Sequence, residues 1–175
     1  MKGGHVVTET RTHLVDDFSL EMTGKDIGKL REAAHAIPQG TRINITFLGN
    51  EDLSMRVEAA RVVLEEGFVP VPHISARRLK SRAELREFLD ELKRVGASER
   101  IFIIGGDPKV PEGPFPDSLS VIDSGLLPEF GVREVGIAGY PEGHPEIATD
   151  ELWSHMVAKI RSLREQGLGR VVLTQ

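Results

Sequence analysis

The chain has 175 residues and a mass of 19.3 kDa, a length that favours one domain. Its 27 acidic and 22 basic residues give a net charge of −5, without the basic excess that offsets phosphates in nucleic-acid and anionic-membrane binders. It has no cysteine, which excludes disulfides, thiol nucleophiles and thiolate-bound metals. No apolar run approaches ~20 residues and the N-terminus lacks a signal-peptide pattern, so we expect a cytoplasmic protein that binds neither nucleic acid nor membrane.

Short β-rich runs alternate with helical stretches along the chain. In chain order they predict a strand over Phe18–Met22, a helix over Lys25–Ala36, a strand over Arg42–Phe47, a helix over Glu51–Glu66, a strand over Phe68–Ser75, a helix over Ser81–Val95, a strand over Arg100–Ile104, a weaker helix over Ser118–Glu129, a strand over Glu134–Gly139, a helix over Thr149–Gln166 and a strand over Arg170–Thr174. Ser81 precedes Glu84 by the spacing of a capping box, and Thr149 or Asp150 is the expected N-cap of the last helix. The alternation predicts a single-domain α/β fold with a parallel sheet and right-handed crossovers.

Two parallel-sheet architectures compete for this pattern. Length favours an open, doubly wound sheet, because a complete (β/α)₈ barrel needs ~250 residues. Polar residues favour the barrel, because they lie in or just after all six predicted strands, whereas an open sheet needs functional groups at only two or three strand ends. These residues are Glu21, Thr46, His73, Asp107, Tyr140 with Glu142 and His144, and Gln175.

Alternation within strands, as in Ile43-Asn44-Ile45-Thr46, also suits a barrel wall with an inward and an outward face. Since the sequence stops on its sixth strand, we expect residues 1–175 to form the N-terminal three-quarters of a (β/α)₈ TIM barrel, with six of its eight strands.

Glu21 is the first candidate catalytic residue. It is flanked by Leu20 and Met22, and a carboxylate in an apolar pocket has a raised pKa, so that it can hold a proton near neutrality and act as a general acid. The alternative is a wall glutamate paired with Arg42 or Lys25.

The segment Gly105-Gly106-Asp107-Pro108 follows an apolar strand. Its glycines let the backbone approach a ring or a phosphate and Asp107 can accept a hydrogen bond from a ring N–H, although a plain turn explains the same residue types. His73 lies inside an apolar run, which is more typical of a hydrogen-bonded wall residue than of a metal ligand. No metal-ligand spacing is present, and we expect no metal.

The stretch GYPEGHPE over residues 139–146 is the most unusual in the chain. Two Pro-Glu pairs, Tyr140 and His144 lie within eight residues of an apolar strand, and two prolines make a loop stiff enough to position side chains. The basic run over residues 76–80 is ordinarily a solvated loop, but at a barrel mouth it could serve an anionic ligand.

Taken in order, these stretches resemble the methylenetetrahydrofolate reductase family, FAD-dependent (β/α)₈-barrel enzymes of one-carbon metabolism. The resemblance is carried by FSLEM (18–22), VPHIS (71–75), IIGGDP (103–108), IAGYPEGHPE (137–146) and LTQ (173–175). The order and spacing of these motifs extend it over residues 17–175, and the IAGYPEGHPE loop is its most specific part.

The resemblance implies a ping-pong reaction in which NADH or NADPH passes hydride to FAD, and 5,10-methylenetetrahydrofolate then takes it to become 5-methyltetrahydrofolate. It implies that Glu21 is the general acid that helps open the methylene bridge, that Asp107 acts in catalysis near flavin and pterin, and that Gln175 binds the pterin. The implied flavin-binding positions are Thr46, His73, Gly106, Asp107, Tyr140 and His144. The implied partner is a small-molecule folate, and a homo-oligomer stays open.

The chain also departs from the family pattern. It has LEMTGK where FEFFPP is common, Gly105 where an arginine is typical, and Leu163 near the place of a helical lysine. Two alternatives therefore stay open: a divergent enzyme acting on another folate or one-carbon carrier, and a non-catalytic flavin- or folate-binding module.

Overall fold

The structure is a computed structural model that describes residues 17–47, 49 and 51–174. Gln175, the expected pterin-binding residue, lies outside the described residues. The elements are β1 (Ser19–Thr23), α1 (Ile27–Ala33), η1 (Ala34–Ala36), β2 (Arg42–Thr46), α2 (Leu53–Glu65), β3 (Val69–Ser75), η2 (Ala76–Arg78), α3 (Arg82–Arg94), β4 (Arg100–Ile104), α4 (Ser118–Ile122), η3 (Leu127–Phe130), β5 (Glu134–Gly139), α5 (Thr149–Glu165) and β6 (Gly169–Thr174).

The six strands form one parallel sheet in the order β1-β2-β3-β4-β5-β6, so neighbours in the chain are also neighbours in the sheet. Each predicted strand agrees with an observed one to within one residue at either end. The predicted α/β fold and parallel sheet are confirmed.

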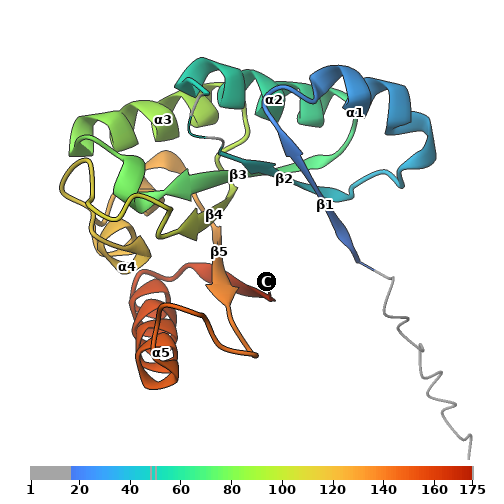
Figure 1. Cartoon of the computed structure of the whole chain (residues 1–175). Helices are drawn as coiled ribbons and strands as arrows, with labels where there is room; N and C mark the ends of the chain where they lie inside the picture. The colour runs from blue at the N-terminus through green and yellow to red at the C-terminus, as the bar shows by residue number, and fades with distance from the viewer. Residues whose placement is uncertain (1–16, 48, 50, 175) are drawn as a thin grey trace, which may run out of the picture.

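All five α-helices contribute to a single core on one face of the sheet (Figure 1). Ile43 and Ile45 of β2 point into this core, as alternation along a strand requires. One buried core residue from each helix is Leu30 of α1, Val63 of α2, Leu89 of α3, Val121 of α4 and Leu163 of α5. We call this face the helix-covered face and the opposite one the inner face.

The inner face has its own small apolar cluster, formed by Val71, Phe102 and Ala138. In the part of the chain that the structure describes, this cluster contains strand residues and Tyr140, which directly follows β5, but no helix residue.

The sheet is strongly curved toward its inner face. Ser19 and Leu20 of β1 line the same cavity as Leu173 of β6, although four strands lie between β1 and β6. In a flat sheet, five strand spacings of about 4.8 Å would separate these strands by ~24 Å. Curvature thus brings the first and last strands around one space.

Helix boundaries show where the sequence-based expectations were wrong. The helix expected over residues 118–129 ends at Ile122 and is followed by the separate turn η3, because Gly125 takes a positive φ of 71° between them. The N-cap of α5 is Ala148, without a side-chain cap, rather than Thr149 or Asp150. Ser81 does cap α3, accepting a hydrogen bond from the Glu84 backbone N–H at 3.1 Å.

Gly136 gives a direct test of packing on the inner face. A Cβ atom at this position would lie 2.3 Å from the Phe102 ring, which is 1% exposed. We expect Gly136→Ala to lower the free energy of unfolding by about 1–3 kcal/mol, the usual cost of overpacking. Urea denaturation measures this difference.

The matched control is Gly28→Ala, because a Cβ at Gly28 of α1 meets nothing within 4 Å. Helix propensity should leave this variant as stable as the native chain or stabilise it by up to about 1 kcal/mol. Equal stability of the two variants would contradict the close packing of Phe102 on Gly136.

Candidate functional site

A cavity of about 210 Å³ opens on the inner face of the sheet. Its lining comes from five of the six strands and consists of Ser19, Leu20, Glu21, Asn44, His73, Phe102 and Leu173. Of the residues that the sequence singled out, the cavity contains Glu21 and His73. Asn44 was noticed in the sequence only as part of an alternating strand, and no role was assigned to it.

His73 is held in the wall of the cavity by its neighbours. It is 4% exposed, its ring lies 4.7 Å from that of Phe102 between centroids, and its Nε2 lies 3.4 Å from Oδ1 of Asn44. Burial lowers the pKa of His73 from 6.5 to about 4, so the imidazole is neutral at physiological pH. The hydrogen-bonded wall residue expected from the sequence is confirmed.

Glu21 lies on the inner face, because the adjacent Met22 points into the helix-covered core. The expectation that an apolar pocket buries Glu21 is wrong for the described structure, in which Glu21 is exposed. The reason is that alternation buries only its neighbour Met22, while Leu20 is itself 36% exposed. Pairing with Arg42 does not occur, because Arg42 forms its ion pair with Asp17 at 3.5 Å.

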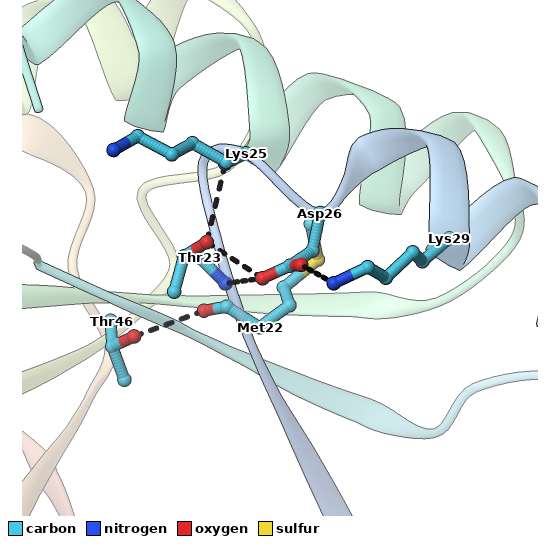
Figure 2. A network of polar contacts seen from close by, with 6 residues as sticks. All are labelled: Met22, Thr23, Lys25, Asp26, Lys29 and Thr46. Carbon is cyan, nitrogen blue, oxygen red and sulfur yellow. Dashed lines mark hydrogen bonds and ion pairs between the residues drawn. The ribbon is translucent and has the colours of Figure 1, made fainter.

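Thr46 lies at the carboxyl end of β2, where its hydroxyl donates to the backbone carbonyl of Met22 at 3.2 Å (Figure 2). Beside it, the turn after β1 is closed by Asp26, which accepts from the Thr23 hydroxyl at 2.6 Å and from the Lys29 ammonium at 2.8 Å. Hydrogen bonds from Lys29 and Thr23 hold the pKa of Asp26 well below its usual range. These contacts fix the ends of β1 and β2 relative to each other.

Asp107 lies in the bend after β4 and is not among the residues that line the cavity. Its carboxylate is 90% exposed and accepts from the Arg78 guanidinium at 3.2 Å. Gly106 has a φ of 93°, and a Cβ there would lie 2.0 Å from the Ser75 hydroxyl oxygen, so the bend requires glycine at this position. The segment bends at Asp107, and among the described contacts no backbone hydrogen bond closes a turn there.

The basic run after β3 does not form a uniform solvated loop. Arg78 is 24% exposed and lies 5.5 Å from the centre of the Phe47 ring. Arg56 of α2 stacks on the same ring at 4.2 Å, and burial lowers its pKa to about 10. Arg77 is tied to the backbone carbonyl of Pro116 at 2.7 Å. Two guanidinium groups therefore share one aromatic ring at the carboxyl edge of β2.

Tyr140 and His144 lie after β5 at the same carboxyl edge of the sheet. Their rings meet edge to face at 5.3 Å, and His144 Nδ1 accepts from the Glu146 backbone N–H at 3.1 Å. Tyr140 also packs on the apolar cluster of the inner face. The two rings are therefore in contact at this edge, and the stiffness expected from the two prolines stays a prediction.

The structure accordingly divides the sequence-predicted residues between two places. Glu21 and His73 line the cavity, whereas the others follow the carboxyl ends of β2, β4 and β5, which parallel pairing brings to one edge. These others are Thr46, Gly106, Asp107, Tyr140 and His144.

Among the described residues, no group of three or more His, Asp or Glu side chains is placed to hold a metal ion. No helix in the described part of the chain is long and apolar enough to span a membrane. A comparison of the sequence with models of known protein families finds no match.

His73 makes stability depend on pH. Because the folded-state pKa of about 4 lies below the ordinary 6.5, the unfolded chain binds more protons between these pH values. The neutral His73 ring makes its full contribution to the free energy of unfolding above pH 6.5. This contribution, about 3 kcal/mol in all, is lost as the pH falls toward 4. Urea denaturation at pH 7 and pH 4.5 measures this loss.

Replacing His73 separates its part of the pH dependence of stability from the part caused by carboxylates. We expect His73→Gln to reduce the difference in stability between the two pH values, while His35→Gln, at an exposed histidine of η1, leaves it unchanged. The same pH dependence in all three proteins would show that His73 is not buried in its neutral form.

Proposed function

We propose that the chain forms part of a (β/α)₈ barrel and is a flavin-dependent reductase of 5,10-methylenetetrahydrofolate. The barrel is supported by the sequential strand order, by helices that pack on one face, and by a cavity shared between β1 and β6. In a doubly wound sheet the strand order reverses at a switch point and helices cover both faces. Neither feature is found among the described elements.

One observation carries the functional proposal: Glu21 and His73, which the family resemblance assigns to proton transfer and to flavin contact, line one cavity on the inner face. They come from strands that are not neighbours, β1 and β3, and are 52 residues apart in the numbering of the chain. These two side chains are far apart in the sequence but lie in the same cavity, as the residues of a catalytic site in a barrel do.

The carboxyl edge of the sheet has donors that fit a flavin nucleotide. The Ser75 hydroxyl is buried and has no hydrogen-bond partner among the described residues, and Gly106 permits close backbone approach beside it. Arg78 brings a cation to the edge from the segment after β3, which suits a phosphate even though Gly105 replaces the arginine typical of the family. Tyr140 adds an aromatic surface.

In this proposal, FAD, when bound, would supply the redox chemistry that couples oxidation of NADH or NADPH to reduction of the folate. Thr46, Tyr140 and His144 would hold the cofactor at the carboxyl edge, and Glu21 would give a proton to the amine nitrogen of the methylene bridge. The Asp107 carboxylate lies outside the cavity in its ion pair with Arg78, and it would favour the positive charge that develops on the folate only after moving toward the bound molecule. Proton transfer requires that Glu21 lose its exposure to water when the folate fills the cavity.

A second candidate function is a non-catalytic flavin- or folate-binding module. The exposure of Glu21 favours it, as does the ion pair in which the structure holds Asp107. Both candidates bind ligand at the same site, and they differ in whether the bound folate is reduced.

The absorption spectrum of the purified chain tests the flavin part of the proposal. We expect titration with FAD to give a saturable change in the visible flavin band, and Arg78→Gln to weaken binding by about 10-fold through the loss of one charge-assisted contact. Arg86→Gln is the control, because Arg86 pairs with Glu129 outside the site. A flavin band that does not respond to the protein would contradict the reductase and the flavin-binding module, and would leave only a folate-binding module.

Glu21→Gln tests the catalytic role. Reduction of bound flavin by a nicotinamide should stay near the native rate, while reduction of the folate should slow by about 10²–10⁴-fold, because only the second half-reaction needs the proton. Stopped-flow measurement of each half-reaction, with Glu142→Gln in the exposed loop as the control, separates the two. Equal losses in both halves would show that Glu21 maintains the site rather than donates the proton.

A further inference from the structure

The orientation of the Asn44 side chain is fixed by its contacts with β1. Its side-chain nitrogen lies 3.2 Å from the Ser19 hydroxyl oxygen and 3.3 Å from the backbone carbonyl oxygen of Leu20. A carbonyl oxygen can only accept, so the atom facing Leu20 must be the nitrogen of the amide and not its oxygen. Oδ1 of Asn44 is then directed away from β1, toward His73 on β3.

This orientation decides which nitrogen of His73 carries the proton. Oδ1 of Asn44 has no proton to give, so the contact at 3.4 Å requires an N–H on Nε2 of His73. A neutral imidazole has one N–H, and Nδ1 is therefore the acceptor nitrogen. Leu20, Asn44 and His73 form a hydrogen-bonded chain across β1, β2 and β3.

The charges around His73 are consistent with a neutral ring. Phe102 of β4 and Asn44 of β2 contact the ring without charge. From α2 on the helix-covered face, Arg56 donates to the backbone carbonyl of His73 at 3.3 Å, which places a cation behind the strand. Glu21 of β1 is the other titratable group in the described lining of the cavity, and it is exposed to solvent.

We propose that Asn44 is a positioning residue that locks His73 in its neutral Nε2–H tautomer, so that His73 offers the ligand only a hydrogen-bond acceptor. The two titratable groups of the cavity then have different tasks. His73 accepts a hydrogen bond from an N–H or O–H group of the bound molecule, and Glu21 supplies the proton. The assignment of that proton to a folate rests on the proposed function, whereas the tautomer lock does not.

Nitrogen NMR on the whole chain with labelled histidine tests the lock directly, because long-range couplings to the ring carbons' protons distinguish the two tautomers. The signals of His73 among the six histidines are identified by their loss in His73→Gln. At pH 7 we expect a single Nε2–H pattern. An Nδ1–H pattern, or a mixture of both tautomers in the native chain, would overturn the proposal without any substitution of Asn44.

Two substitutions of Asn44 separate positioning from simple packing. Asn44→Leu keeps the approximate volume but removes Oδ1, and we expect His73 to become a mixture of tautomers. Asn44→Asp keeps an oxygen toward His73 and adds a charge, so we expect the Nε2–H pattern to persist with the pKa of His73 raised by roughly 1–3 pH units. Thermal unfolding shows that each variant is folded, and an unchanged tautomer in folded Asn44→Leu would overturn the proposal. If Asn44→Leu does not fold, Asn44→Asp decides: a lost Nε2–H pattern overturns the lock.

A kinetic measurement connects the lock to the proposed reaction. We expect Asn44→Asp to slow folate reduction and to add an ionisation to its pH profile. A folded Asn44→Asp variant with the native pH profile would overturn the role of the lock in the reaction. An Nε2–H tautomer in a native chain that reduces no folate would instead contradict the proposed function and support the lock alone.

Discussion

One-sided burial of the parallel sheet is the constraint on which the rest of this structure depends. In β2, Ile43 and Ile45 are buried beneath the helices while Asn44, between them, points to the inner face. A sheet covered by helices on both faces would need apolar side chains at all three positions. Because only one face carries the helix-packed core, the other can hold polar groups at the cost of a smaller apolar cluster.

Curvature turns that polar face into a site. Gly136 lets the Phe102 ring lie directly over β5, and Phe102 in turn packs against the His73 ring. The cavity beyond them is lined by residues of both β1 and β6, which would lie far apart in a flat sheet. Small and large residues on neighbouring strands thus shape the inner face, and the same packing holds His73 in place.

The site combines groups in three different electrostatic situations. His73 is buried and neutral, Glu21 is exposed on the same cavity, and Asp107 is paired with Arg78 outside it. A ligand that enters the cavity would remove water from Glu21, and separation of the Arg78–Asp107 ion pair would free Asp107. The proposed reductase therefore relies on ligand binding to complete the site, which distinguishes it from a site whose acid is desolvated in advance.

The sequence by itself determined the local structure: which segments are strands, which residues alternate between faces, and that polar groups accompany every strand. These properties follow from periodicity and turn chemistry within a few residues, which is why the strands agree with the prediction and His73 was recognised as a wall residue. Tertiary structure alone decided that Glu21 is exposed, that Arg78 pairs with Asp107 and that Asn44 meets His73. Both of those pairs join residues 29 positions apart, so their contacts depend on strand register and sheet curvature, which no local pattern specifies.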